Sequence, residues 1–132
     1  MRDVQLYGDV LDFRVYYANP NVIIPNDLPP IAGATVRLPA LGFEARTDGR
    51  GVFLIDLGQV ASDCATDVIV TAPGFGDWVY RSAPILTYEH SGGYMRLFVA
   101  LETKSQDGTY RHKLETPRPG CIRIAGAIRG AS

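Results

Sequence analysis

Apolar and polar residues alternate in short runs along almost the whole chain, and Gly, Pro, Asn and Asp residues separate the runs. A period of two is typical of a strand that buries one face, and no segment repeats a helical period over three turns. The pattern therefore predicts an all-β chain with seven strands and no helix. The predicted strands span residues 4–15, 34–38, 43–47, 52–57, 66–72, 78–86 and 94–102.

Two turns and one inner surface follow from the same pattern. Residues 48–51 (Asp-Gly-Arg-Gly) and residues 91–93 (Ser-Gly-Gly) supply the backbone freedom that tight turns between strands need. A change of face at Gly8 predicts a bulge in the first strand. Alternate side chains should fill the space between two sheets about 10 Å apart. The predicted core consists of Leu6, Val36, Leu38, Phe53, Ile55, Val68, Val70, Val79, Leu97 and Val99.

A long segment over residues 16–30 interrupts the strand pattern. Four prolines and three asparagines surround its apolar triplet, and proline cannot donate a hydrogen bond to a central strand. Connections of this length are uncommon and often bind partners, although an apolar loop also serves simply to cover a core. The predicted contact residues are Tyr16, Tyr17, Val22, Ile23 and Ile24.

Composition and charge narrow the class of protein. Apolar residues make up 46% of the 132 positions and charged residues 20%, which is a globular balance. A formal net charge of −1 provides no field that would attract DNA, RNA or anionic lipid, and no apolar run reaches the ~18 to 20 residues of a membrane span. We expect one domain over residues 1–103. The tail, residues 104–132, is expected to be either an added edge strand or a linker.

The two cysteines, Cys64 and Cys121, match no metal-binding spacing such as C-x-x-C. A disulfide between them would stabilise the fold by about 4 kcal/mol on the chain-entropy model and would indicate an oxidising compartment, whereas buried free thiols would indicate nothing. We favour the disulfide because Cys121 follows Pro119 and Gly120 in a tail that little else holds. An extracellular or cell-surface location is expected, with any export signal absent from this chain.

Four short motifs occur in a fixed order. They are Gly33-Ala34-x-Val36-x-Leu38, Thr47-Asp48-x-x-Gly51-x-Phe53-x-Ile55-x-Leu57, Val70-x-Ala72-x-Gly74-Phe75 and Phe98-Val99-x-Leu101. Together they resemble the carboxypeptidase regulatory-like domain over residues 4–103. The resemblance implies a seven-stranded antiparallel Greek-key β-sandwich, transthyretin-like or Ig-like. It also implies a non-catalytic accessory module. The insertion over residues 16–30 departs from the pattern of that family.

Candidate catalytic and metal-binding residues are sparse. His90 and His112 both lie in polar segments, where solvated turns explain them better than a catalytic triad does. The aspartates are scattered and show no calcium-loop spacing, and aspartate commonly begins turns by bonding its own backbone. We therefore expect no metal site and no cofactor.

A second transthyretin relative, the hydroxyisourate hydrolase family, offers the sharpest catalytic alternative. Residues 10–12 (Val-Leu-Asp) and 129–130 (Arg-Gly) resemble its terminal motifs, but Asp9 stands where that family has a histidine and Ile128 where it has a tyrosine. A carboxylate cannot replace an imidazole poised near neutrality. The chain is therefore expected not to be an enzyme.

Two non-catalytic functions remain. The leading prediction is an accessory or structural module whose sheet edges and inserted loop contact a neighbouring domain or a second copy. The alternative is a carbohydrate-binding module, because Trp, Tyr and other aromatic residues on a sheet face stack against sugars as well as anchor protein interfaces. The predicted stacking residues are Trp78, Tyr80 and Tyr94.

Overall fold

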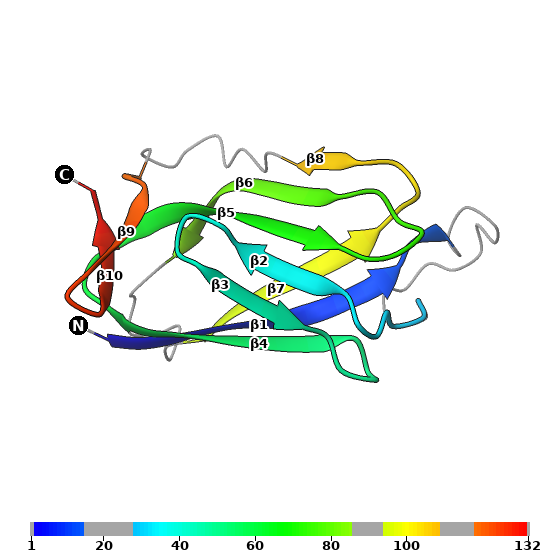
Figure 1. Ribbon diagram of the computed structural model, residues 1–132, viewed down its shortest axis with the longest axis horizontal. Coiled ribbons are helices and arrows are strands. Elements are labelled where there is room, and N and C mark those ends of the chain that lie inside the picture. Colours follow the sequence, from blue (N-terminus) through cyan, green and yellow to red (C-terminus); the bar gives the residue numbers. More distant parts are fainter. Residues whose placement is uncertain (1, 15–27, 86–93, 109–117, 132) are drawn as a thin grey trace.

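The structure, a computed structural model, describes residues 2–14, 28–85, 94–108 and 118–131, which form two five-stranded sheets (Figure 1). Sheet A contains, in order, β7 (Tyr94–Leu101), β1 (Arg2–Asp12), β4 (Val52–Val60), β10 (Ala127–Gly130) and β9 (Cys121–Ile124). Sheet B contains, in order, β3 (Phe43–Arg46), β2 (Thr35–Leu38), β5 (Cys64–Thr71), β6 (Trp78–Ile85) and β8 (Gln106–Gly108). The predicted all-β, two-sheet architecture is confirmed.

The described residues hold ten strands, where the sequence predicted seven. The three additional strands, β8, β9 and β10, lie within residues 104–132 and extend one edge of each sheet. They contain three or four residues each, which is too short a run for alternation to identify a strand. The prediction of purely antiparallel pairing is also wrong, because the pairs β1–β7, β6–β8 and β4–β10 are parallel.

The core fills the space between the sheets, and eight of its ten predicted members are buried. The two exceptions are Val79 and Leu97, which are only partly buried. On β6 the inward position belongs to Trp78, which lies opposite the buried Val70 of β5 and is 5% exposed. The larger aromatic side chain gains more from burial than valine does, and this sets which face of β6 turns inward.

The predicted bulge in β1 lies elsewhere than expected. The register between β1 and β4 shifts between Val4 and Gln5, and Gly58 of β4 adopts a φ of +72° at that point. Gly8 instead makes room for the core. A Cβ atom at Gly8 would overlap the carbonyl oxygen of Leu97 and lie 2.9 Å from the ring of Phe53. The missing side chain therefore lets β1, β7 and the Phe53 ring pack closely.

A disulfide and several hydrogen bonds hold the β9–β10 hairpin against both sheets. Cys64 of β5 and Cys121 of β9 are bonded, with their Cα atoms 4.9 Å apart. The amide of Ala61 donates to the carbonyl of Ile128 at 2.8 Å, and Ile128 is buried. The hairpin is therefore part of the sandwich, and the alternative of two free thiols is excluded in this structure.

The turn that joins β3 to β4 has the geometry expected of its sequence. The amide of Gly51 donates to the carbonyl of Asp48 at 3.0 Å, and the carboxylate of Asp48 accepts the amides of Arg50 and Val52 at 2.8 and 3.0 Å. Gly51 has a φ of +74°, and a Cβ atom there would lie 2.7 Å from the carbonyl oxygen of Val10. Glycine is needed for both reasons.

Candidate functional site

Most of the predicted contact residues cannot be placed. Tyr16, Tyr17, Val22, Ile23 and Ile24 lie outside the described residues, as does the side chain of Tyr94. The backbone of Tyr94 begins β7, at the edge of sheet A. The contact role of these residues stays a prediction.

The predicted stacking face does not form as expected. Trp78 is buried, and its ring meets that of Tyr80 edge to face, with the ring centroids 6.1 Å apart. Tyr80 packs against the core as well. An indole with 5% exposure offers no face to a sugar, so Trp78 is a core residue and not a binding residue.

The exposed apolar side chains gather on one face of the molecule. Leu54 is 56% exposed, Ile124 50%, Phe98 45% and Ile122 36%, and they are the large hydrophobic residues with high exposure among those described. Leu54 alternates with buried residues of β4, and Phe98 precedes the buried Val99 of β7. All four lie on strands of sheet A, with their side chains on its outer face.

Two of these side chains, Leu54 and Phe98, lie near Tyr7 and one ion pair in the register of the sheet; Tyr7, Leu54 and Phe98 are here called the strand cluster. Tyr7 of β1 lies between Leu54 of β4 and Arg96 of β7 in the register of the sheet. The guanidinium of Arg96 donates to the carboxylate of Asp9 at 2.7 Å, and Asp9 is the register partner of Phe98. This hydrogen bond raises the pKa of Arg96. An ion pair thus lies beside the apolar side chains on the outer face of sheet A.

Ile122 and Ile124 form a second group, here called the hairpin cluster. They lie on β9, where Ile122 faces Arg129 and Ile124 faces Ala127 across the hairpin. Arg123, between them, turns the other way, donates to the carbonyl of Leu41 at 3.0 Å and covers the ring of Phe43. The hairpin cluster lies at the end of sheet A that contains both chain termini, opposite the end where β1 finishes (Figure 1).

The outer face of sheet B has a different character. Arg37 and Glu44 form an ion pair at 3.4 Å between neighbouring strands, and both side chains are more than half exposed. Asp67 accepts the amide of Ser82 at 2.9 Å, where β6 contains a bulge. None of the four exposed large apolar side chains lies on this sheet.

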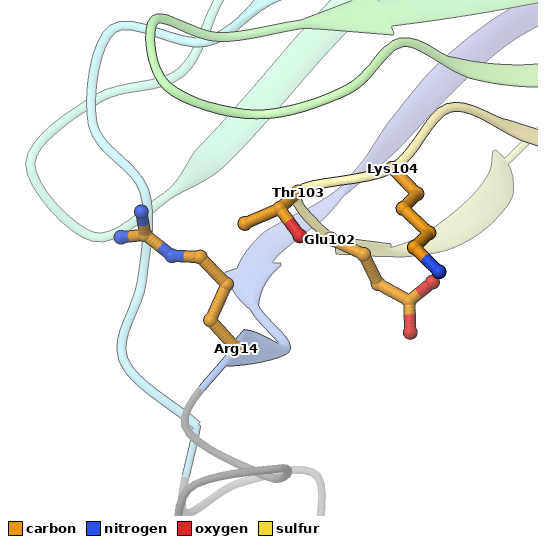
Figure 2. Close-up of a pocket in the computed structure, with 4 residues that line it drawn as sticks. All are labelled: Arg14, Glu102, Thr103 and Lys104. Carbon is orange, nitrogen blue, oxygen red and sulfur yellow. The ribbon is translucent and has the colours of Figure 1, made fainter.

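A depression of about 420 Å³ lies at the end of the sandwich where β1 finishes, beside the start of the predicted contact loop. Figure 2 shows Arg14 on one side of it, with Glu102, Thr103 and Lys104 on the other. Two of these four side chains are basic, and one is acidic. The described part of its lining is therefore polar and carries three charged side chains and one threonine hydroxyl.

The position of Arg14 is fixed by its neighbours. Its Nε and terminal nitrogen donate to the two carboxylate oxygens of Asp12 at 3.0 and 2.9 Å, and its guanidinium lies 4.0 Å from the ring centroid of Phe75. The bond from Arg14 lowers the pKa of Asp12, and the bond to Asp12 raises the pKa of Arg14. Because the two charges neutralise each other, Arg14 supports the turn before β6 better than it would attract an anion.

A second depression, of about 370 Å³, lies beside the disulfide. Its lining includes Thr66 and Cys121, and the hydroxyl of Thr66 is buried without a partner among the described residues. The sulfur of Cys121 is bonded to Cys64 and is therefore not a thiolate nucleophile. The described lining of this depression therefore offers the Thr66 hydroxyl for hydrogen bonding, and its cysteine sulfur is held in the disulfide.

The clear pKa shifts in the described residues all favour the charged forms. Asp12 and Asp48 have lowered pKa values, and Arg14 and Arg96 have raised ones. The pKa of Asp48 falls because backbone amides, that of Val52 first, donate to its carboxylate. A general acid or base needs a pKa moved towards neutrality, and these four groups move away from it.

The two motifs shared with the hydroxyisourate hydrolase family lie far apart. Residues 10–12 end β1, whereas Arg129 lies on β10, which pairs with the far end of β4 at Val60. Val60 is also the register partner of Arg2, at the start of β1 (Figure 1). At about 3.3 Å per residue, nearly the full length of β1 separates the motifs, so they do not form one site.

No group of three or more His, Cys, Asp or Glu side chains that could hold a metal ion occurs in the part of the chain that the structure describes. Asp48, Asp56 and Asp67 instead accept backbone amides in turns or bulges. His90 and His112 lie outside the described residues.

The exposure of Leu54 and Phe98 was missed by the sequence analysis, although a signal was present. Residues 52–55 (Val-Phe-Leu-Ile) and 97–101 (Leu-Phe-Val-Ala-Leu) are apolar at every position, not at every second one. In an antiparallel or mixed sheet with one solvated face, such a run predicts an apolar side chain on the outside. Exposure of Leu54 and Phe98 follows from this break in alternation.

No protein-family model matches the sequence. No curated protein matches it either. Within the described residues, no helix is long and apolar enough to cross a membrane. The function must therefore be argued from the two faces, the edges and the depressions of this sandwich.

Proposed function

We propose that this chain is a non-catalytic accessory module of the transthyretin-like, carboxypeptidase regulatory-like kind, and that it contacts other proteins through the outer face of sheet A. The observation that carries the proposal is the gathering of Leu54, Phe98, Ile122 and Ile124 on that one face. Scattered exposed apolar residues need no explanation, but a group on one face is typical of an interaction surface.

The energetics favour a protein partner. Burying a leucine or phenylalanine side chain is worth roughly 1.5 to 3 kcal/mol, so covering Leu54 and Phe98 together would support a specific contact. Tyr7 and the Arg96–Asp9 ion pair supply the aromatic and arginine character that is enriched in interfaces. A sugar-binding function lacks comparable support, because Trp78 is buried.

The absence of catalysis is part of the proposal. Asp12 and Arg14 neutralise each other beside the larger depression, and Cys121 is bonded beside the smaller one. The pKa shifts of Asp12, Asp48 and Arg96 favour the charged forms of these groups. These observations support a binding role over acid–base or nucleophilic chemistry.

The family and the location belong to the same proposal. The motif residues Thr47, Asp48 and Gly51 form the connection between the two sheets, as a transthyretin-like sandwich would require. The disulfide supports a location outside the reducing cytosol, at the cell surface or in the extracellular space. Strands β8 to β10 extend the seven-stranded arrangement and would distinguish this chain within the family.

Site-specific photo-crosslinking in cells that express the full chain tests the contact face. A benzoylphenylalanine at position 54 of sheet A should give cross-linked protein adducts, whereas one at position 37 of sheet B should give few. Both positions are exposed and lie on strands, so the two variants are matched in accessibility. Equal adducts from both positions, or none from either, would overturn the proposal.

A further inference from the structure

The proposed contact face ends in a strand that has an open edge. β7 is the last strand of sheet A and spans 8 residues, whereas β3, β8 and β9, which end the sheets elsewhere, span 4, 3 and 4. Within the described residues, the sheet order places β1 as the one neighbour of β7. A long strand at a sheet edge is a template for a further strand.

The inner-facing side chains of β7 are not buried equally along the strand. Val99 and Leu101 are fully buried, but Met95 and Leu97, nearer the start of the strand, pack against the core and remain partly exposed. The described residues therefore cover the first half of β7 incompletely. A strand added at this edge would cover Leu97 while its backbone extended the sheet.

We propose, building on the proposed function, that the strand added here is β7 of a second copy of this chain. The two strands would run antiparallel about a two-fold axis that passes beside Leu97. In that register Arg96 of each copy lies across from Phe98 of the other, on the outer face. Leu97 lies across from Leu97 of the second copy, on the inner side.

Charge selects this register over its neighbour. An axis beside Arg96 would place the two Arg96 side chains directly opposite each other, and like charges in that position are destabilising. The axis beside Leu97 instead sets a guanidinium against an aromatic ring. The fold already uses that contact twice, with Arg14 over Phe75 at 4.0 Å and Arg123 over Phe43 at 4.8 Å.

Asp9 fixes the face of the sheet on which Arg96 lies. The 2.7 Å bond between them holds the guanidinium on the outer face, next to the register position of Phe98. The paired copies would form one continuous sheet from two five-stranded sheets. Their strand clusters would then adjoin across the axis. A two-fold contact of this kind is closed, so the assembly stops at a dimer.

Light scattering of the purified full chain over a concentration series tests the dimer, with two substitutions at one exposed position. Phe98→Arg sets four positive charges around the axis and should weaken association by about tenfold, the effect of roughly 1.4 kcal/mol over two symmetric pairs. Phe98→Asp removes the same ring but sets a carboxylate against Arg96 of the second copy, so it should keep the dimer. If association were driven only by the burial of apolar surface, both substitutions would lower the affinity of the dimer.

A cysteine substitution tests the register. Leu97→Cys should form a dimer linked by a disulfide on a non-reducing gel, because the two Leu97 positions adjoin at the axis. Leu54→Cys, on the outer face of β4, is the control and should stay unlinked. The native cysteines are bonded to each other and buried, so they do not compete.

The outcomes separate this inference from the proposed function. A chain that is monomeric at every concentration, or a dimer whose dissociation constant is unchanged by Phe98→Arg, overturns the pairing of β7 strands. In that case, photo-crosslinks from position 54 to a different protein would still support the proposed contact face. If position 54 gives no cross-link and the chain is monomeric, both proposals fall.

Discussion

The two sheets bury their inner faces in the same way but present opposite outer faces to solvent. Sheet A exposes Leu54 and Phe98 around one close ion pair, whereas sheet B exposes Arg37 and Glu44 as a looser pair. The inner faces are dictated by the need for a core, because every strand must bury one side. The outer faces are free of that constraint. Their difference is therefore the part of the structure that is most informative about function.

Loss of the disulfide should have the largest effect, because this bond ties the hairpin cluster of sheet A to β5 of sheet B. The double variant Cys64→Ala/Cys121→Ala is expected to lose about 4 kcal/mol of unfolding free energy on the chain-entropy model. Urea denaturation measures this loss. Hydrogen exchange should show that amides of β9 and β10 lose protection before those of β1 and β4.

The native chain under reducing conditions is the control for cavity effects in that double variant. It should lose a similar free energy without any change of side-chain volume. A loss well below 1 kcal/mol in both cases would show that the hydrogen bonds of Ala61, Ala65 and Ala131 hold the hairpin without help.

The inner faces of the strands could be predicted well from the sequence, for a physical reason. Alternation reports burial directly, so Val36, Phe53 and Val68 were placed correctly in the core. The prediction of which β6 side chains point into the core was wrong, because it depends on which of two adjacent apolar residues, Trp78 or Val79, points inward. That choice is made by packing across the sheet and not by the local pattern.

The exposed apolar face of sheet A and the tail were less accessible from the sequence. Whether Leu54 stays exposed depends on nothing covering sheet A, which is a property of the whole fold. The short strands of the tail owe their existence to the disulfide and to pairing with β4 and β6. Such strands have little intrinsic preference, so tertiary contacts decide them.

The bulges of the two sheets provide a second, smaller contrast. Gly58 in sheet A and Ser82 in sheet B both have a positive φ, of 72° and 55°. Gly58→Ala should lose about 1 kcal/mol of unfolding free energy, since a left-handed alanine is strained although the space is open. Ser82→Gly should gain about 0.5 kcal/mol, because the strain is relieved and the amide still donates to Asp67. Chemical denaturation measures both. Changes of the same sign would refute the role assigned to these backbone angles.

The turn from β3 to β4 carries the chain from sheet B to sheet A and should make stability depend on pH. Bonds from the amides of Val52 and Arg50 lower the folded pKa of Asp48 below its unfolded value. Its contribution is therefore complete above the unfolded pKa, about 3.9, and is lost as pH falls through the folded pKa. Asp48→Asn should lower Tm at pH 7 and match the native chain near pH 2. Asp56→Asn, which neutralises a carboxylate that accepts only one amide, is the control and should show a smaller difference. A Tm difference that persisted unchanged at pH 2 would rule out the carboxylate charge as its cause.

The smallest effect should come from the two ion pairs, and it tests the contrast between the faces most directly. Arg96 and Asp9 are 2.7 Å apart and Asp9 is 26% exposed, whereas Arg37 and Glu44 are 3.4 Å apart and both more than half exposed. Asp9→Asn should therefore lower Tm slightly at low salt, while Glu44→Gln should leave it almost unchanged. The effect of Asp9→Asn should shrink in 1 M salt, where screening acts over about 3 Å. Dilute protein keeps the copies apart during the measurement. If both substitutions behaved alike, the Arg96–Asp9 pair would be as loosely held as the one on sheet B, and the contrast between the two outer faces would lose this part of its support.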